Sequence, residues 1–218
     1  MSVRINKFVA QATGMSRREA DKAISQGRVT INGSTAVVGE SLTPSDKVGL
    51  DNHALEPETL TTIILNKPAG FVCSRRGQGS QTIYDLLPSG YGHLKPVGRL
   101  DKDSSGLILL TNDGNLANQL THPRYSKVKV YEVELNAPLQ PFHHQLIADQ
   151  GVRLFDGVSK FQLSKLDSAR HWQVTMTEGR NRQIRRTFDS LGYKVTRLHR
   201  IQFGDYKLGQ LAQGRFRP

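Results

Sequence analysis

The chain has 218 residues, of which 30 are Lys or Arg and 19 are Asp or Glu, so its formal net charge is +11 at pH 7. Such an excess favours a polyanionic partner, most often nucleic acid. The single cysteine excludes an internal disulfide, and no Cys or His cluster has zinc-ligand spacing. Because the sequence has no signal-peptide pattern and no run of about 20 apolar residues, we expect a cytoplasmic protein without a membrane partner.

The N-terminal segment is predicted to begin with two helices. Residues 5–12 place apolar side chains at helical spacing, and Gly14 ends this pattern. Ser16 and Glu19 match a capping box, which predicts a second helix that stops at Gly27. The cations of this segment are predicted to contact nucleic-acid phosphates: Arg4, Lys7, Arg17, Arg18, Lys22 and Arg28.

A small sheet is expected to follow the two helices. Residues 29–31 and 36–38 flank an Asn-Gly pair and predict a hairpin, with a third strand at 47–50. Residues 51–61 show no convincing period and are interpreted as a linker. We therefore place the domain boundary after residue 58, giving domains 1–58 and 59–218.

The second domain is predicted to contain more strands than helices, without regular alternation of the two. The expected strands cover residues 62–66, 107–111 and 127–135, and the expected helices cover 115–121, 141–150 and 182–191. This order predicts an α+β fold.

Residues 98–106 read Gly-Arg-Leu-Asp-Lys-Asp-Ser-Ser-Gly and lead directly into the apolar run 107–110. The loop sets Asp101 between Arg99 and Lys102, and nearby cations favour the charged form of a carboxylate. An ionised carboxylate can act as a nucleophile or a base. A surface turn capped by Asp and Ser before a buried strand is the alternative interpretation.

Tyr131 lies in the predicted strand 127–135, on a side that changes from polar to apolar at Val133. An aromatic ring at such a boundary can stack on a base while its hydroxyl stays hydrated. A strand tyrosine that covers part of the core is the alternative.

Basic residues are concentrated between residues 178 and 200, where Glu178 and Asp189 are the only acids. Ile184, Phe188 and Leu191 indicate that one helix face here is buried. We interpret the cations as a phosphate-binding surface, with a solvated basic helix face as the alternative. The predicted RNA contacts of the second domain are Lys102, Lys129, Arg180, Arg182 and Arg186.

The segment from residue 98 to 114 resembles the catalytic signature of RNA pseudouridine synthases, in particular the RsuA-type branch that modifies ribosomal RNA. The N-terminal segment resembles an S4 RNA-binding domain. Lys-Val-Tyr at 129–131 and Gln-Ile-Arg at 183–185 match two further motifs of the family. The resemblance covers nearly the whole chain. It implies an S4 domain followed by a catalytic domain with a mostly antiparallel mixed sheet and flanking helices.

The resemblance also implies roles for individual residues. Asp101 would act on the ribose, Tyr131 would pack against the target uracil, and Arg185 would pair with Asp101. Arg99 would enter the RNA helix and take the place of the flipped uridine, with a phosphate contact as the alternative. Ile184 would pack against the flipped base, although its helical position fits a core residue equally well.

The implied reaction breaks the N1–C1′ bond of a uridine, rotates the uracil and rejoins it through C5. It needs no cofactor or metal, and attack by Asp101 and a glycal route both fit. Residues 181–186 look more like the large-subunit members, so 23S rRNA is the preferred substrate, with 16S rRNA or tRNA as alternatives. We expect a monomer.

Two other classes of protein are compatible with parts of the sequence. A Mg²⁺-dependent nuclease would use Asp101 and Asp103 as ligands, but Arg99 and Lys102 would repel the ion, and we expect Asp103 to cap the turn instead. A non-catalytic S4-type RNA-binding or ribosome-assembly protein would need only the N-terminal basic hairpin. It would leave the three catalytic motif matches unexplained.

Overall fold

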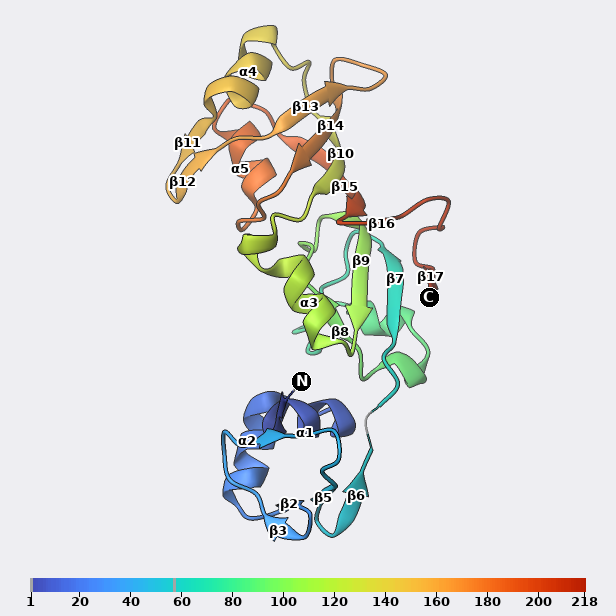
Figure 1. Cartoon of the computed structure of the whole chain (residues 1–218). Helices are drawn as coiled ribbons and strands as arrows, with labels where there is room; N and C mark the ends of the chain where they lie inside the picture. The colour runs from blue at the N-terminus through green and yellow to red at the C-terminus, as the bar shows by residue number, and fades with distance from the viewer. Residues whose placement is uncertain (1, 57) are drawn as a thin grey trace. The chain divides into compact units, whose positions relative to one another are not determined.

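The computed structural model describes residues 2–56 and 58–218, and these residues form two compact units, one extending to Thr61 and the other from Thr62 to Pro218 (Figure 1). Each unit has buried apolar clusters of its own. Within the described residues, no helix combines the length and the apolar character needed to cross a membrane.

The first unit begins with the two predicted helices, α1 (Ile5–Thr13) and α2 (Arg17–Ser25). Gly14 adopts a φ of 73°, a left-handed conformation that ends α1 at little cost for glycine. The capping box of α2 is present, because Ser16 Oγ accepts from the Glu19 backbone N–H at 3.2 Å and Glu19 Oε2 accepts from the Ser16 N–H at 2.6 Å. Ile5, Val9, Ala20, Ala23 and Ile24 pack between the helices and the sheet.

Four strands among the described residues of this unit form a sheet in the order β3-β2-β5-β6. They are β2 (Val29–Ile31), β3 (Ser34–Thr35), β5 (Val48–Leu50) and β6 (His53–Leu55), and a separate pair joins β1 (Val3–Arg4) to β4 (Ser41–Leu42).

Two expectations for this sheet were wrong. The hairpin partner of β2 lies at residues 34–35 and not at 36–38, because Asn32 and Gly33 form a two-residue turn that fixes the register. Residues 51–61 do not form a plain linker, since β6 returns along β5 through a turn in which Asp51 and Asn52 have φ of 50° and 66°. Asp and Asn tolerate this left-handed conformation, which allows the strand to reverse without glycine.

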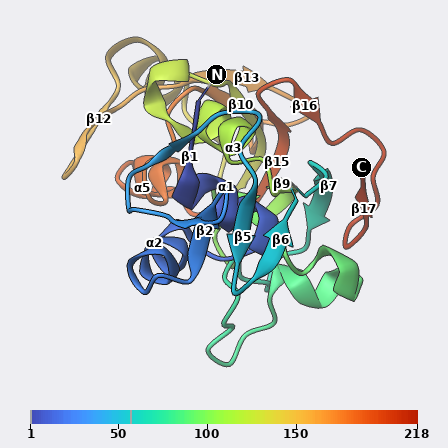
Figure 2. The ribbon, with the colours of Figure 1, turned by 60° about the horizontal axis from the view of Figure 1, so that its bottom comes forward.

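In the second unit, whose residues 62–218 are all described, nine strands form one sheet with seven of them in the order β13-β14-β10-β15-β9-β7-β17. The strands are β7 (Thr62–Lys67), β8 (Lys95–Val97), β9 (Ser105–Thr111), β10 (Lys129–Leu135), β13 (Gln162–Lys165), β14 (His171–Met176), β15 (Val195–Phe203), β16 (Tyr206–Lys207) and β17 (Phe216–Arg217). β8 pairs with β9, and β16 pairs with β15. β17 lies beside β7 at one edge (Figure 2).

The single parallel pair of strands in this sheet, β9 with β15, joins its two halves. Its contact point brings Gly106 opposite Arg200. Gly106 has a φ of 104°, and a Cβ at this position would lie 2.3 Å from the Arg200 carbonyl oxygen, so only glycine fits. β9 is buried along its whole length, which places the preceding loop on a rigid support.

Helices flank the sheet, so the unit is α+β with a mostly antiparallel sheet, as predicted. They are α3 (Gly114–Thr121), α4 (Pro141–Gln145), which continues as a π-helical turn η4 (Leu146–Gln150), and α5 (Gln183–Asp189), with short 3-10 turns η1 (Ile83–Leu86), η2 (Ser89–Tyr91) and η3 (Pro123–Tyr125). A hairpin of β11 (Val152–Leu154) and β12 (Gly157–Ser159) extends away from the sheet in both ribbon views (Figures 1 and 2).

Candidate active site

A buried lysine holds the backbone of the loop that carries Asp101. Lys67, the last residue of β7, is 0% exposed, and its Nζ donates to the carbonyl oxygens of Pro68 at 3.0 Å, Asp101 at 3.1 Å and Ser104 at 2.6 Å. Burial lowers the pKa of Lys67, while nearby acidic groups oppose this effect. Lys67 therefore fixes the path of the loop. Our sequence reasoning assigned it no role, although a lysine that closes an apolar strand is an unusual core residue.

The residue before Asp101 is anchored as well. Leu100 is 8% exposed, and its backbone N–H and carbonyl both contact Cys73 Sγ, at 3.4 Å and 3.3 Å. Burial raises the pKa of the Cys73 thiol, so it stays neutral and serves as a hydrogen-bonding partner. The Asp101 side chain itself remains 32% exposed. The loop thus presents an accessible carboxylate on a firmly held backbone.

Two arginines of the α5 region converge on Asp103. Arg182 donates to both carboxylate oxygens of Asp103, at 3.0 Å and 3.1 Å, and Arg185 Nε lies 3.3 Å from Asp103 Oδ2. Burial acts to raise the pKa of Asp103, but the Arg182 hydrogen bonds and the two arginine charges outweigh it and leave the pKa lowered. Asp103 is therefore the centre of an ion-pair cluster. The sequence had suggested only a turn cap.

The predicted direct pair between Arg185 and Asp101 is wrong for this structure. The cation nearest to Asp101 is Arg182, whose Nη1 lies 3.6 Å from Asp101 Oδ2. Arg185 instead donates to the carbonyl oxygens of Val195 and Asp103, both at 2.9 Å, and its side chain is 11% exposed. Arg185 thus links the loop to β15, because its guanidinium donates to the Asp103 carbonyl in the loop and to the Val195 carbonyl in β15.

Arg182 reaches this position through its backbone. It precedes α5 with a φ of 47° and a ψ of 31°, in the left-handed region that non-glycine residues rarely adopt. The sequence predicted Arg182 only as an RNA contact, because no sequence pattern reveals this left-handed backbone.

Tyr131 lies on β10, opposite Arg200 of β15, which in turn lies opposite Gly106 of β9. Two strand spacings, about 10 Å, therefore separate the backbone of Tyr131 from the start of β9. Tyr131 is 8% exposed and shares one core cluster with Leu100 and Ile184. The predicted apolar side of this strand is buried, and the contact of Tyr131 and Ile184 with a target base stays a prediction.

The other cations near the loop differ in whether their side chains already make hydrogen bonds within the protein. Arg99 is exposed, and among the described residues its side chain makes no hydrogen bond or ion pair. Lys102 Nζ contacts Ser80 Oγ at 2.9 Å. Lys129 Nζ donates to the Thr177 carbonyl at 2.9 Å, and burial lowers the pKa of this lysine. Arg99 is consequently the cation of this group that is most available to a ligand.

Arg180 and Arg186 are occupied by an acid outside the segment 178–200. Arg186 donates to the two carboxylate oxygens of Asp156 at 3.0 Å and 2.7 Å, and Arg180 Nη1 donates to Asp156 Oδ1 at 2.9 Å. The segment 178–200 holds few acids because the acid that pairs with these arginines, Asp156, lies earlier in the sequence. Their predicted contact with RNA stays a prediction.

The metal-dependent alternative finds no support in the arrangement of the acids. Both carboxylate oxygens of Asp103 accept hydrogen bonds from Arg182, so they already face a cation of the protein. Within residues 2–56 and 58–218, no group of three or more His, Cys, Asp and Glu side chains is placed to hold a metal ion.

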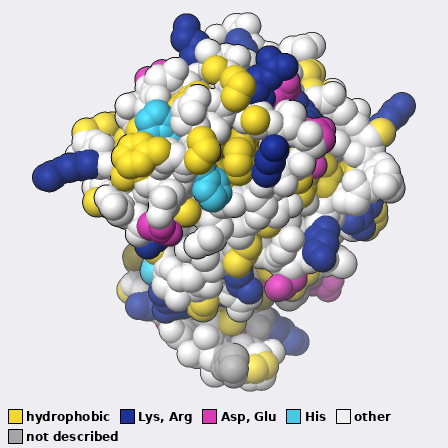
Figure 3. Space-filling view, turned by 90° about the horizontal axis from the view of Figure 1, so that it is seen from above, with side chains coloured by type: hydrophobic (Ala, Val, Ile, Leu, Met, Phe, Trp, Pro, Cys, Tyr) yellow, Lys and Arg dark blue, Asp and Glu magenta, His cyan; other side chains and the backbone are white. Residues whose placement is uncertain are grey.

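The positive charge is distributed unevenly between the units. Residues 62–218 hold 23 Lys and Arg against 12 Asp and Glu, whereas residues 1–61 hold seven of each. Figure 3 shows one face of the molecule, on which several Lys and Arg side chains stand out from the surface. The second unit thus carries the whole net charge of +11.

Within the first unit, the charge is divided between the helices and the sheet. Residues 2–28 hold six cations against two acids, and residues 29–61 hold one cation against five acids. Arg17, Arg18 and Lys22 are exposed on α2, whereas Arg28 pairs with Asp51 at 2.9 Å. Arg4 donates to the carbonyl of Gly39. The open positive surface of this unit is therefore the outer face of α2.

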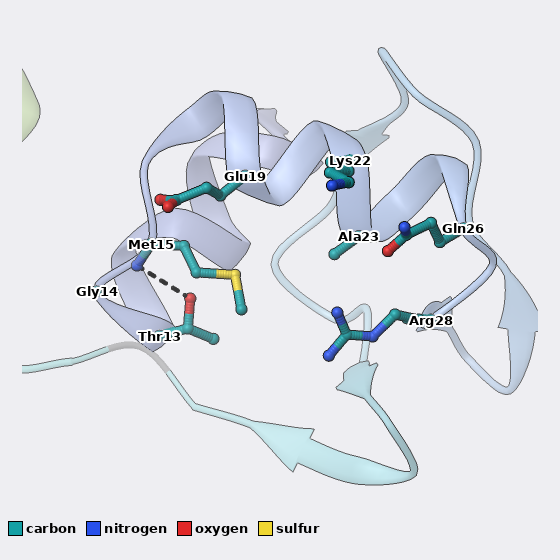
Figure 4. Close-up of a pocket in the computed structure, with 8 residues that line it drawn as sticks. All are labelled: Thr13, Gly14, Met15, Glu19, Lys22, Ala23, Gln26 and Arg28. Atoms are coloured by element: carbon teal, nitrogen blue, oxygen red, sulfur yellow. Dashed lines mark hydrogen bonds between the residues drawn. The ribbon is translucent and has the colours of Figure 1, made fainter.

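A hollow of about 510 Å³ lies beside this face, lined by α2 and the segments on either side of it (Figure 4). Met15 and Ala23 contribute apolar surface, and Lys22, Gln26 and Arg28 contribute polar groups. Glu19 also lines the hollow, and Arg28 is paired with Asp51.

Comparison with known proteins agrees with this arrangement. The profile of the S4 domain matches residues 3–48, and the profile of RNA pseudouridylate synthases matches residues 61–190. The two matches, in this order along the chain, define an RNA-modifying enzyme with an N-terminal S4 domain. The chain belongs to the RNA pseudouridylate synthase family, so it isomerises uridine to pseudouridine in RNA.

Curated relatives match nearly the whole chain. An uncharacterized RNA pseudouridine synthase of Aquifex aeolicus is 37% identical over 100% of this chain and 90% of that protein. A dual-specificity RNA pseudouridine synthase of Escherichia coli is 36% identical over 99% of this chain and 75% of that protein. The ribosomal large subunit pseudouridine synthase B of Bacillus subtilis is 34% identical over 97% and 89%.

A crystal structure of a pseudouridylate synthase has the same fold. It superposes with a TM-score of 0.71 at 35% identity and covers 100% of this chain and 96% of that chain. The match extends over both the S4 region and the catalytic region.

Proposed function

We propose that this enzyme isomerises a specific uridine of ribosomal RNA, preferably of 23S rRNA, and that it works as a monomer in the cytoplasm without a cofactor. The observation that carries the proposal is the accessible Asp101 carboxylate, held on the Lys67-anchored loop with Arg182 Nη1 3.6 Å away. The relatives named for the ribosomal large subunit support 23S rRNA as the substrate. The assignment to the cytoplasm follows from this substrate.

In this proposal the reaction follows one of two routes. In the first, the Asp101 carboxylate forms an ester bond to C1′ of the flipped uridine as the N1–C1′ bond breaks, and C5 of the turned uracil then displaces the carboxylate from C1′. In the second, Asp101 removes the C2′ proton as the N1–C1′ bond breaks, and this proton returns to C2′ when C5 bonds to C1′. In both routes a base then removes the proton from C5, and N1 takes up a proton. Tyr131 packs against the uracil, and its ring is held in place by the core cluster around it. Arg182 holds the Asp101 carboxylate in position through their ion pair.

Arg99 supplies the group that takes the place of the flipped uridine. A base inside an RNA helix must leave its stack before a protein group can reach C1′. Arg99 suits this role because it is exposed, follows the turn at Gly98, and makes no side-chain hydrogen bond or ion pair among the described residues. Ile184, at 5% exposure, packs against the flipped base from the core side.

The S4 domain adds affinity for RNA through phosphate contacts. Arg17, Arg18 and Lys22 are exposed on α2, and an exposed cation is free to displace counterions from the RNA backbone. Arg4, Lys7 and Arg28 add to the positive field of the first unit, although Arg28 pairs with Asp51 and Arg4 donates to the Gly39 carbonyl. In the catalytic domain, Lys102, Lys129, Arg180 and Arg186 extend the positive field, even where their side chains also make internal contacts.

The test uses transcripts of 23S rRNA, 16S rRNA and tRNA tritiated at uridine C5, because rejoining through C5 releases that tritium to water. We expect release from 23S rRNA, limited to the equivalent of one uridine per transcript. Release from tRNA alone would contradict the ribosomal substrate. One relative is named for dual specificity, so release from 23S rRNA together with a second RNA would extend the proposal. Absence of release from all three would contradict it.

A further inference from the structure

The tip of the β11–β12 hairpin carries an aromatic side chain that no step of the proposed reaction uses. Phe155 is 90% exposed, the highest value among the large hydrophobic side chains of the described residues. The hairpin that carries it stands away from the sheet in Figures 1 and 2. An exposed phenylalanine alone is common and has no functional meaning. Phe155 differs from such residues because hydrogen bonds hold the turn that carries it.

The hairpin tip is held rigidly by arginines that point toward it from the α5 region. Asp156, next to Phe155, accepts two hydrogen bonds from Arg186, at 3.0 Å and 2.7 Å. Arg180 donates to the Asp156 carbonyl at 2.9 Å and to the Val158 carbonyl at 2.8 Å. These bonds hold Asp156 and the β12 side of the turn, so the backbone next to Phe155 loses little conformational freedom when the ring binds a ligand.

The Phe155 ring is also stacked on one of these cations. Arg186 Cζ lies 4.5 Å from the centroid of the ring. The guanidinium is already oriented by Asp156 and by the Asn181 carbonyl, which accepts from Arg186 Nε at 2.9 Å. One part of the ring is therefore covered by a fixed cation, and the rest of its surface is open, as its exposure requires.

The same helical region that holds Phe155 also reaches the catalytic loop. Arg186 lies in α5, and Arg182 at the start of α5 contacts both Asp101 and Asp103. A base bound at Phe155 would thus stand in a defined position relative to the reacting uridine. Arg153 on β11 is exposed beside the tip, and the acid at the tip, Asp156, is neutralised by its two arginine partners. A negatively charged chain with aromatic bases fits this surface better than an apolar protein segment.

We propose that Phe155 stacks on an unpaired base of the substrate RNA other than the target uridine, in a layer over the Arg186 guanidinium, with Arg153 contacting a neighbouring phosphate. The proposal rests on the proposed function in that the RNA is the enzyme's substrate. It adds a second point of recognition outside the active site, which would help to select an RNA with an unpaired nucleotide at a fixed distance from the modified one.

The test compares RNA affinity and steady-state kinetics of the wild type with Phe155→Ala, Phe155→Trp and Phe142→Ala. Base stacking on an aromatic ring contributes about 1–3 kcal/mol, so Phe155→Ala should raise Kd and KM for the 23S transcript about tenfold and leave kcat unchanged. Phe155→Trp should retain the wild-type affinity. Phe142, at 70% exposure on α4, is the matched control and should have no effect when replaced.

A fully paired RNA duplex of the same length separates stacking from a general loss of affinity. Phe155→Ala and the wild type should bind this duplex equally. The proposal is overturned if Phe155→Ala binds the 23S transcript within twofold of the wild type, or if Phe142→Ala weakens binding to the same extent. A wild-type enzyme that releases no tritium from any transcript contradicts the proposed function instead, because the stacking test reads binding and the tritium test reads chemistry.

Discussion

Replacement of Lys67 by methionine tests how the catalytic loop is held. Methionine fills the space of the lysine stem but leaves the carbonyls of Pro68, Asp101 and Ser104 without their donor. Hydrogen bonds to a charged group contribute about 1.5–3 kcal/mol each, and burial of the ammonium group offsets several kcal/mol of the sum. We therefore expect Lys67→Met to lower the free energy of unfolding by about 2–4 kcal/mol.

The same variant should be impaired in catalysis at temperatures where it is still folded. A displacement of about 1 Å at a reacting group can reduce the rate about 100-fold, so kcat should fall by about this factor while the affinity for RNA is kept. Urea unfolding and tritium release measure the two effects, and Lys207→Met, at an exposed position of β16, serves as the control. A Lys67→Met protein with wild-type stability and wild-type kcat would refute the role assigned to this lysine.

Three further predictions concern charge. Replacing Arg17, Arg18 and Lys22 together by alanine should raise Kd for the transcript and leave kcat on saturating RNA unchanged; loss of kcat with intact binding would reverse the roles of the domains. Wild-type binding should weaken steeply between about 50 and about 200 mM salt. Each phosphate contact should add about 0.9 to the slope of log Kd against the logarithm of the salt concentration, and a salt-independent Kd would contradict the phosphate contacts. Because the folded-state pKa of Asp103 is lowered from its ordinary value of 3.8, its stabilisation is present above that value and is lost as the pH falls through the folded-state pKa. Urea unfolding should therefore show a stability difference between the wild type and Asp103→Asn that shrinks on acidification, and a difference that stays constant with pH would contradict this role.

Local signals in the sequence predicted the features that depend on neighbouring residues. The capping box at Ser16, the stop at Gly14 and the turn after residue 31 all act within a few positions of the chain, and the structure contains each of them. The loop around Asp101 and the half-apolar strand of Tyr131 were recognisable for the same reason, because alternation and turn residues are local patterns.

Features that depend on distant residues could not be predicted in this way. Asp103 and Arg182 are far apart in sequence, and which of two nearby arginines approaches Asp101 depends on the left-handed backbone of Arg182. The carbonyl partners of Lys67 are 34 and 37 residues away for Asp101 and Ser104, so no pattern in the sequence reveals them. Strand β6 was missed because its residues have weak strand propensity and are held by pairing with β5.

The most direct test of the account is the release of tritium from C5-labelled 23S rRNA by the wild type, by Asp101→Asn and by Asp205→Asn. Asp205 is an exposed acid whose carboxylate lies 3.6 Å from Lys127 Nζ, so its replacement controls for loss of one negative charge. The account predicts release by the wild type and by Asp205→Asn, and no release by a folded Asp101→Asn that still binds the RNA. Release by Asp101→Asn at the wild-type rate would contradict the assignment of Asp101 as the reacting carboxylate.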